Sequence, residues 1–288
     1  MSELLDRSSY CYEDEKYFYL YKHVDATDGS LSIIRNGTLK FTKPQNFNDP
    51  FDCLFHIAPD YIGNSEALRS QDEINGVKRS PARRVQESQR VTNIFKMDKN
   101  KLTNLQREIR NERTYICCLN QNPLNILMWS HYAQQHKGFL IEFRFKKFPE
   151  FVTLENDLIF IPMPINYNNE FPSLVKKDRK TNVIADKGFL TKSLDWSYEK
   201  EWRIIRYGIE GVSEIQKYPR KMVLSSVIAG IQVDPRIKNE WKEALKSVSI
   251  ELGREIQLFD TKILEHRYQL TVPNHPRLDI LAQSKKKT

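Results

Sequence analysis

The sequence contains few cysteines and no long apolar run. Its 288 residues include four cysteines, Cys11, Cys53, Cys117 and Cys118, which form no C-x-x-C pair and no zinc-ligand spacing with histidine. No segment approaches the roughly 18 apolar residues of a membrane-spanning helix, and the acidic N-terminal segment does not resemble a secretory signal. We therefore expect a cytoplasmic protein without a disulfide framework, a structural zinc site or a membrane span.

Glycine is also scarce, at 10 residues. The glycine-based phosphate-binding motifs G-x-G-x-x-G and G-x-x-x-x-G-K-[ST] are absent, as are the G-x-S-x-G turn and the H-E-x-x-H helix. These absences argue against a Rossmann-type dehydrogenase, a kinase, an α/β-hydrolase and a zinc protease.

Apolar and aromatic side chains are abundant, at 40% and 11% of the residues, which is enough to form a core. Apolar runs and alternation predict strands, while apolar residues three and four apart predict helices. We expect a single α+β domain, residues 1–288, with a central mixed or antiparallel sheet and flanking helices. Strands are expected at 17–24, 38–42, 114–119, 138–143, 158–162, 201–207, 223–231 and 256–261. Helices are expected at 123–135 and 235–252, and a short one after a cap at Asp28 or Ser30.

The formal net charge of +8 is concentrated in part of the chain. Residues 66–113 carry more Lys and Arg than Asp and Glu, with apolar residues at helical intervals, and are expected to form a basic helical insertion. Residues 208–288 are expected to complete the sheet. The positive charge suits a nucleic-acid partner without specifying one.

Two polar and aromatic segments are candidate ligand sites. F-N-D-P-F-D at 47–52 is typical of an Asx turn, but the amide of Asn48 could also donate to and accept from a ligand. I-L-M-W-S-H-Y-A at 126–133 places Trp129 and Tyr132 on one helix face. That face forms either core or a platform on which a flat ring stacks.

A third candidate is S-L-D-W-S-Y-E-K-E-W-R-I-I at 193–205. On a strand, Glu199, Glu201 and Arg203 would project from one face. The simpler interpretation is an ion pair on a sheet face. The alternative is a site in which one glutamate polarises a sugar hydroxyl or stabilises an oxocarbenium-like centre, while Arg203 binds a phosphate.

These three segments, with the Tyr21-Lys22 strand before them and K-G-F at 137–139, resemble the bacterial domain of unknown function family 2971, over about residues 17–207. That resemblance implies no established activity. More loosely, an aromatic first strand, a central tyrosine and a late E-x-E resemble the layout of ADP-ribosyltransferase-like proteins. This second resemblance implies an ADP-ribosyltransferase-like fold and NAD as the substrate.

By the second resemblance, Glu201 would hold the ribose 2′-hydroxyl, Glu199 would orient the substrate, and Tyr132 would stack on nicotinamide. Together with the residues of the three segments, the expected NAD-binding set is Tyr21, Lys22, His23, Asn48, Trp129, Tyr132 and Arg203. The expected protein is an ADP-ribosyltransferase or NAD glycohydrolase that acts as a bacterial toxin or phage-defence effector. Its acceptor would be protein, nucleic acid or water, and its partner an antitoxin or another defence protein.

Two other functions remain open from the sequence. One is a nucleic-acid-binding module in which the basic insertion follows phosphates and Trp129, Trp196 and Trp202 stack on bases. The other is a metal-dependent nuclease that uses Asp49, Asp52 and Glu201. Convergence of Tyr21, Asn48, Tyr132 and Glu201 in one cleft is the arrangement expected of the NAD-cleaving enzyme.

Overall fold

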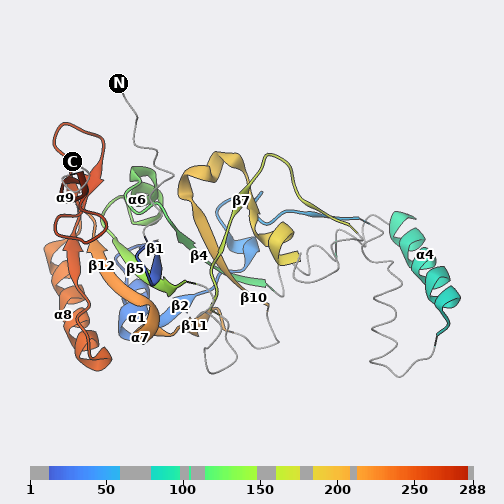
Figure 1. Ribbon diagram of the computed structural model, residues 1–288, viewed down its shortest axis with the longest axis horizontal. Coiled ribbons are helices and arrows are strands. Elements are labelled where there is room, and N and C mark those ends of the chain that lie inside the picture. The colour runs from blue at the N-terminus through green and yellow to red at the C-terminus, as the bar shows by residue number, and fades with distance from the viewer. Residues whose placement is uncertain are drawn as a thin grey trace.

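The computed structural model describes residues 13–58, 79–97, 104, 114–147, 160–175, 184–207 and 213–284. In this part of the chain, a seven-stranded sheet forms the centre of the molecule (Figure 1). Neighbouring strands are antiparallel, except that β12 and β13, at one edge of the sheet, are parallel. The expected α+β fold with a mixed sheet is confirmed. The strands, in sheet order, are β13 (Leu258–Asp260), β12 (Leu224–Ala229), β5 (Phe139–Lys146), β1 (Tyr17–Val24), β4 (Thr114–Asn120), β10 (Glu201–Tyr207) and β6 (Met163–Pro164).

Helices and short strand pairs surround this sheet. The described helices are α1 (Asp28–Arg35), α4 (Pro81–Met97), α6 (Ile126–Tyr132), α7 (Arg220–Val223), α8 (Pro235–Leu252) and α9 (Ile280–Ser284), with the shorter turns η2 (Pro44–Asn46), η5 (Ile184–Phe189) and η6 (Leu194–Glu199). The short strands are β2 (Thr38–Lys40), β3 (His56–Ile57), β7 (Asn166–Tyr167), β8 (Ser173–Leu174), β9 (Thr191–Lys192), β11 (Ile215–Lys217), β14 (Lys262–Ile263) and β15 (Leu270–Thr271).

Helices α1 and α8 cover one face of the sheet and bury the larger core cluster. In α8, the buried apolar residues recur at three- and four-residue intervals, so that they share the face turned to the sheet. The Trp241 ring stacks on Phe139 of β5, with 3.9 Å between the ring centroids. Asp234 caps the first turn of α8. Gly253, with a φ of 66°, ends the helix in the left-handed conformation that glycine adopts without strain.

Helix α6 and the C-terminal segment cover the opposite face. Trp129 and Ala133 at α6 pack with Leu270, Val272 and Leu278 from the end of the described chain. The indole Nε1 of Trp129 donates to the Pro123 carbonyl oxygen at 2.7 Å. The helix that carries one candidate segment is therefore held on the sheet by a buried tryptophan.

A buried carboxylate also attaches the C-terminal segment to this face. Glu142 of β5 accepts from Arg277 Nε at 3.0 Å and from Nη2 at 2.6 Å. It accepts further hydrogen bonds from the Tyr21 hydroxyl at 3.0 Å and the Ser225 hydroxyl at 2.6 Å. Burial would raise the pKa of Glu142, but the hydrogen bonds and charge of Arg277 outweigh burial and lower it.

Strands β1 and β4 separate next to the point where they pair. Tyr21 lies opposite Asn120. Beyond this pair, Lys22 and His23 of β1 and Cys118 of β4 line a cavity. The ammonium of Lys22 donates to the Cys118 carbonyl oxygen at 3.0 Å, so that this backbone acceptor has a partner away from the strand ladder.

Several expected elements differ from those observed. Helix α1 begins after Thr27, whose hydroxyl accepts from the Ser30 N–H, so neither Asp28 nor Ser30 is the cap. Glu199 lies in η6, and the strand β10 begins two residues later. Of the strand expected at 158–162, residues 158 and 159 lie outside the described residues and 160–162 form no strand.

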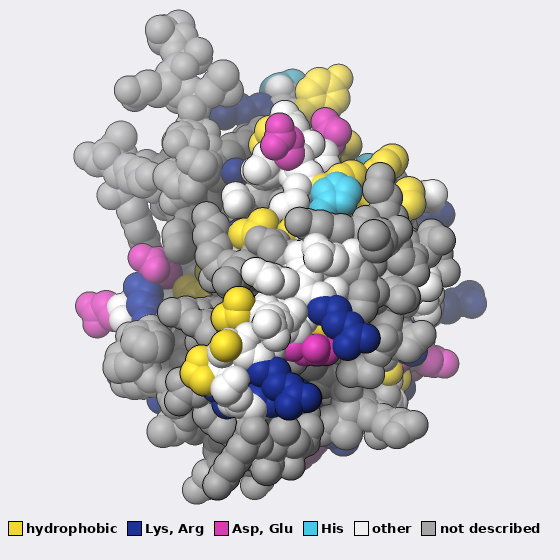
Figure 2. Space-filling view, turned by 90° about the vertical axis from the view of Figure 1, so that its right-hand side faces the viewer, with side chains coloured by type: hydrophobic (Ala, Val, Ile, Leu, Met, Phe, Trp, Pro, Cys, Tyr) yellow, Lys and Arg dark blue, Asp and Glu magenta, His cyan; other side chains and the backbone are white. Residues whose placement is uncertain are grey.

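The basic insertion is described in part. Helix α4 lies within residues 66–113 and apart from the sheet, at one side of the molecule (Figure 1). Apart from 79–97 and 104, the insertion lies outside the described residues. Figure 2 faces this side and shows basic, acidic and hydrophobic side chains interspersed among the described residues. None of the helices described combines the length and apolar character needed to cross a membrane.

Candidate functional site

The three candidate segments meet at one cavity of about 420 Å³, on the face of the sheet where β1 and β4 separate. Its volume lies in the range of small-molecule sites. Loop 46–52, helix α6, the turn before β10 and the two separating strands each contribute to its wall. The lining residues on which the site is built are Lys22, His23, Lys40, Asn48, Asp52, Cys118, Asn120, Tyr132, Lys192, Glu199 and Glu201.

A buried lysine joins the acidic residues at this cavity. The Lys192 ammonium donates to Glu199 Oε2 at 2.6 Å and to Glu201 Oε2 at 2.8 Å, and it lies 3.6 Å from Asp52 Oδ2. All four side chains are almost completely buried. Ions removed from water in this way are stable when they are paired and hydrogen-bonded to each other.

Arg203 binds the same carboxylates from β10. Its Nε donates to Glu201 Oε1 at 2.7 Å, and its Nη2 donates to Asp52 Oδ2 at 2.7 Å and to Glu201 Oε2 at 3.2 Å. Its Nη1 donates to the Phe189 carbonyl oxygen at 2.8 Å and to Cys53 Sγ at 3.2 Å. The five N–H groups of the guanidinium thus have partners within the protein. Arg203 forms the buried ion pair and has no donor left for a phosphate.

The backbone conformation between η6 and β10 directs both glutamates toward Lys192. Lys200 lies between them with φ 49° and ψ 50°, in the left-handed region, which turns the chain out of η6 and into the strand. The Glu201 N–H donates to the Tyr167 hydroxyl at 2.8 Å and fixes the start of β10. The expected alignment of Glu199 and Glu201 is therefore present, produced by a turn instead of a continuous strand.

The two glutamates have pKa values shifted in opposite directions. Burial would raise the pKa of Glu201, but the charges of Arg203 and Lys192 outweigh burial and hold it far below the usual range. Burial raises the pKa of Glu199. The charge of Lys192 offsets part of this effect and that of Glu201 adds to it, so that the pKa stays above its ordinary value of 4.5. Paired acids with separated pKa values suit different roles in one reaction.

Tyr132 connects α6 to this cluster. Its hydroxyl donates to Glu199 Oε1 at 2.6 Å and is hydrogen-bonded to the side chain of Asn48. Burial, followed by the charge of Glu199, raises the pKa of the Tyr132 hydroxyl, which keeps it protonated as a donor. Each carboxylate oxygen of Glu199 thus accepts from one strong donor, Tyr132 or Lys192, and retains capacity for a ligand donor.

The opposite wall of the cavity is cationic and neutral-polar. Lys22 and the exposed Lys40 supply ammonium groups. His23 is buried, and its Nδ1 lies 3.1 Å from the Asn120 Nδ2, which also donates to the Tyr21 carbonyl oxygen at 2.9 Å. Burial lowers the pKa of His23 to about 3, so the imidazole is neutral near pH 7. This wall suits an anionic group beside uncharged polar groups.

Three of the expected NAD-binding residues, Tyr21, Trp129 and Arg203, do not line the cavity. Tyr21 points to the C-terminal segment and donates to Glu142, because it alternates with Lys22 along β1. The side chain of Trp129, on α6, is fully buried in the core between that helix and the sheet. The cavity brings together Asn48, Tyr132 and Glu201, whereas Tyr21 does not line it, so the expected convergence of these four residues is present for three of them. Glu199, Lys22 and His23 also line the cavity.

The residues of the two other functions are placed differently. Asp49 Oδ1 accepts from the Phe51 N–H at 2.9 Å in the expected Asx turn, while Asp52 and Glu201 are bound by Arg203. Within the described residues, no group of three or more His, Cys, Asp or Glu side chains is arranged to hold a metal ion. The fully buried ring of Trp129 offers no face on which a base could stack.

Sequence reasoning did not identify Lys192, Cys118 or Asn120 as members of the site. Lys192 lies in the two-residue strand β9, which has no recognisable pattern. A signal existed in the charge balance, since several acids near a single Arg203 require a second buried cation. Cys118 and Asn120 are buried or half-buried positions of an apolar strand, where nothing in sequence distinguishes them from core.

Comparison with known proteins agrees with the first resemblance. Residues 128–204 match the family described as "Protein of unknown function (DUF2971)". The resemblance expected from the sequence is confirmed over these residues, which include Tyr132, Lys192, Glu199, Glu201 and Arg203. No curated protein and no solved structure matches the chain.

Proposed function

We propose that the cavity binds NAD and cleaves the bond between its nicotinamide and ribose, as the looser resemblance to ADP-ribosyltransferase-like proteins suggests. The observation that carries the proposal is the position of Glu199. Its carboxyl group lies between the Tyr132 hydroxyl and the Lys192 ammonium at a cavity that also presents Lys22 and Lys40. The ammonium groups of Lys22 and Lys40 suit the diphosphate of NAD.

In this reaction the bond from ribose C1′ to the nicotinamide nitrogen breaks, and both electrons remain on nicotinamide, which leaves as a neutral ring. Positive charge develops on the ribose and is stabilised by a nearby carboxylate. Water or an acceptor hydroxyl then bonds to C1′ and releases a proton. With its raised pKa, Glu199 is suited to receive that proton.

The roles of the two glutamates differ in this proposal from those implied by the resemblance. Glu201 accepts from both Lys192 and Arg203 and keeps these cations in position. Glu199 makes fewer contacts and acts on the substrate. The biological setting, in line with the resemblance, is that of an NAD-consuming toxin or phage-defence effector.

The test compares nicotinamide release from NAD by wild type and by Glu199→Gln, with cell lysate as the source of acceptors. We expect a loss of at least about 100-fold in rate, because the variant cannot take up the proton. Asp195→Asn is the matched control. It alters an exposed acid of the same turn that does not line the cavity, and its rate should equal that of wild type. Full activity in Glu199→Gln, or no release by wild type, would contradict the proposal.

A further inference from the structure

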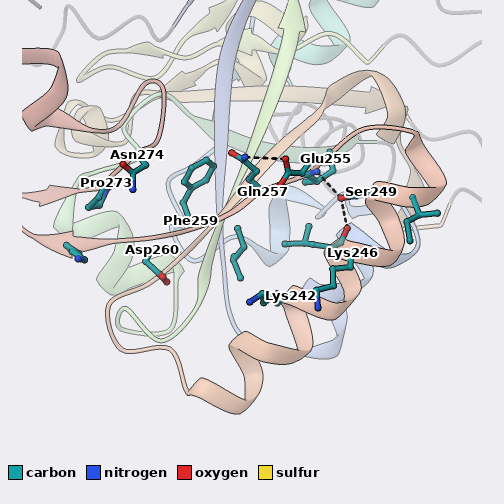
Figure 3. Close-up of a pocket in the computed structure, with 14 residues that line it drawn as sticks. Lys242, Lys246, Ser249, Glu255, Gln257, Phe259, Asp260, Pro273 and Asn274 are labelled. Atoms are coloured by element: carbon teal, nitrogen blue, oxygen red, sulfur yellow. Dashed lines mark hydrogen bonds between the residues drawn. The ribbon is translucent and has the colours of Figure 1, made fainter.

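A second hollow, of about 930 Å³, lies between α8 and the edge strand β13 (Figure 3). None of its lining residues also lines the candidate site. Helix α8 contributes Lys242, Leu245, Lys246, Ser249 and Ile250 to its lining. The other side consists of the continuous run 255–260 together with Lys262, Pro273 and Asn274. Because consecutive residues of a strand point to opposite faces, a wall made of every residue in the run means that the groove follows the backbone edge of β13.

The backbone groups on this edge are directed toward the groove. The Val227 N–H donates to the Gln257 carbonyl oxygen, and the Thr261 N–H donates to the Ala229 carbonyl oxygen, so the odd-numbered residues face β12. Alternation along the strand then directs the N–H and C=O groups of Leu258 and Asp260 outward. In the described part of the chain, no strand pairs with this side of β13.

The side chains at the groove are apolar and positively charged. Ile250 is 83% exposed, and Leu258 is half-buried. Three lysines, Lys242, Lys246 and Lys262, line the groove.

The acids at the groove offset part of this positive charge and leave an excess of lysine. Asp260 is bound by Lys238, with 2.5 Å between Nζ and Oδ1, so Glu255 is the remaining acid of the lining. Lys246 also contacts Glu243 at 2.7 Å, but that pair is exposed and contributes little.

We propose that this groove binds an extended, acidic segment of a partner protein, which adds to β13 as a further strand. Main-chain hydrogen bonds to Leu258 and Asp260 would hold the segment, and its carboxylates would pair with Lys242, Lys246 and Lys262. Apolar side chains between the carboxylates would cover Ile250 and Leu258. Strand addition of this kind combines backbone affinity with side-chain selectivity.

The test uses a fluorescein-labelled peptide of alternating valine and glutamate, with binding followed by fluorescence anisotropy on the full chain. We expect it to bind at least about 10-fold more tightly than the peptide with lysine in place of glutamate. Leu258→Pro removes one outward N–H from an edge position that tolerates proline, and should weaken binding at least about 10-fold. Lys242→Glu/Lys262→Glu should weaken it similarly without altering the backbone.

Lys221→Glu is the control, because it alters an exposed lysine outside the groove. It should bind the peptide as wild type does. No binding by wild type, equal binding of both peptides, or unchanged binding by both variants would overturn the proposal. Self-association that Leu258→Pro abolishes, with no peptide binding, would instead identify the groove as an interface between copies of this chain. Because none of the substituted residues lines the cavity, these outcomes are independent of NAD cleavage.

Discussion

The buried acids at the candidate site outnumber the cations that bind them. Asp52, Glu199 and Glu201 surround Lys192 and Arg203, so full ionisation would leave a net negative charge in a buried place. The raised pKa of Glu199 relieves this excess, because the acid with the fewest cationic contacts takes up a proton most readily. The cluster therefore makes Glu199 the glutamate that takes up a proton more readily than Glu201.

Arg203→Ala is expected to lower the free energy of unfolding by about 3–5 kcal/mol, because it leaves Asp52 and Glu201 buried without their arginine. Urea denaturation would measure this loss. Arg35→Ala is the matched control: its pair with Glu240 is 47% and 46% exposed, so the cost should stay below about 1 kcal/mol. Equal effects of the two substitutions would show that the buried cluster does not stabilise the fold.

Glu201→Gln is a less specific probe of catalysis than Glu199→Gln. It removes a charge to which Lys192 and Arg203 are both bound, so it should reduce stability together with activity.

Glu142 gives the stability a defined dependence on pH. Its pKa in the folded protein lies below the ordinary value of 4.5, so below that pH the unfolded chain binds more protons. The free energy of unfolding should therefore fall as the pH decreases from about 4.5 toward the folded pKa. In denaturation experiments over this range, the free energy of unfolding of Glu142→Gln should fall less steeply with decreasing pH than that of wild type. The two slopes should differ by up to about 1.4 kcal/mol per pH unit. An unchanged slope would contradict the lowered pKa.

The residues of the site were predictable where they belong to dense motifs. Tyr132, Glu199 and Glu201 lie in aromatic and acidic segments that are distinctive in sequence. The separation of Tyr21 from the cavity depends on which face of β1 turns toward it, and that is decided by packing against the C-terminal segment. Tertiary contacts of this kind leave no local pattern.

Among the elements, those with strong periodicity were predicted well. β1, β10 and α8 have the expected bounds, because an aromatic run or regular apolar spacing extends through each. Helix α6 is shorter than the expected 123–135, since Gln134 and Gln135 take positive φ values of 49° and 54°. The two-residue strands are held by neighbouring chain segments and could not be found from local sequence.

The turn from α6 to β5 depends on a close backbone approach at Gly138. A Cβ there would lie 2.0 Å from the Val24 carbonyl oxygen. Gly138→Ala should therefore move the turn, lower the unfolding midpoint and weaken the proposed NAD cleavage through Tyr132 on α6. Gly29→Ala is the control, because its Cβ would lie 3.7 Å from the nearest atom, and differential scanning calorimetry should show a change within about 0.5 kcal/mol. A normal midpoint for Gly138→Ala would contradict this account of the turn.

At the scale of the whole molecule, the C-terminal segment is part of the core. Leu278 is fully buried against the sheet, whereas Leu281 of α9 is 55% exposed. Leu278→Ala should cost about 2–5 kcal/mol of stability, and Leu281→Ala should stay within about 0.5 kcal/mol. Equal, small effects in urea denaturation would mean that this segment is a detachable appendage.

We propose that NAD occupies the cavity where the three segments meet. The most direct measurement is a crystal structure of Glu199→Gln soaked with NAD, in which slow turnover preserves the ligand. We expect the nicotinamide ribose within hydrogen-bond distance of residue 199, with the diphosphate toward Lys22 and Lys40. NAD bound elsewhere, such as in the groove beside α8, or a cavity without NAD at saturating concentration, would contradict it.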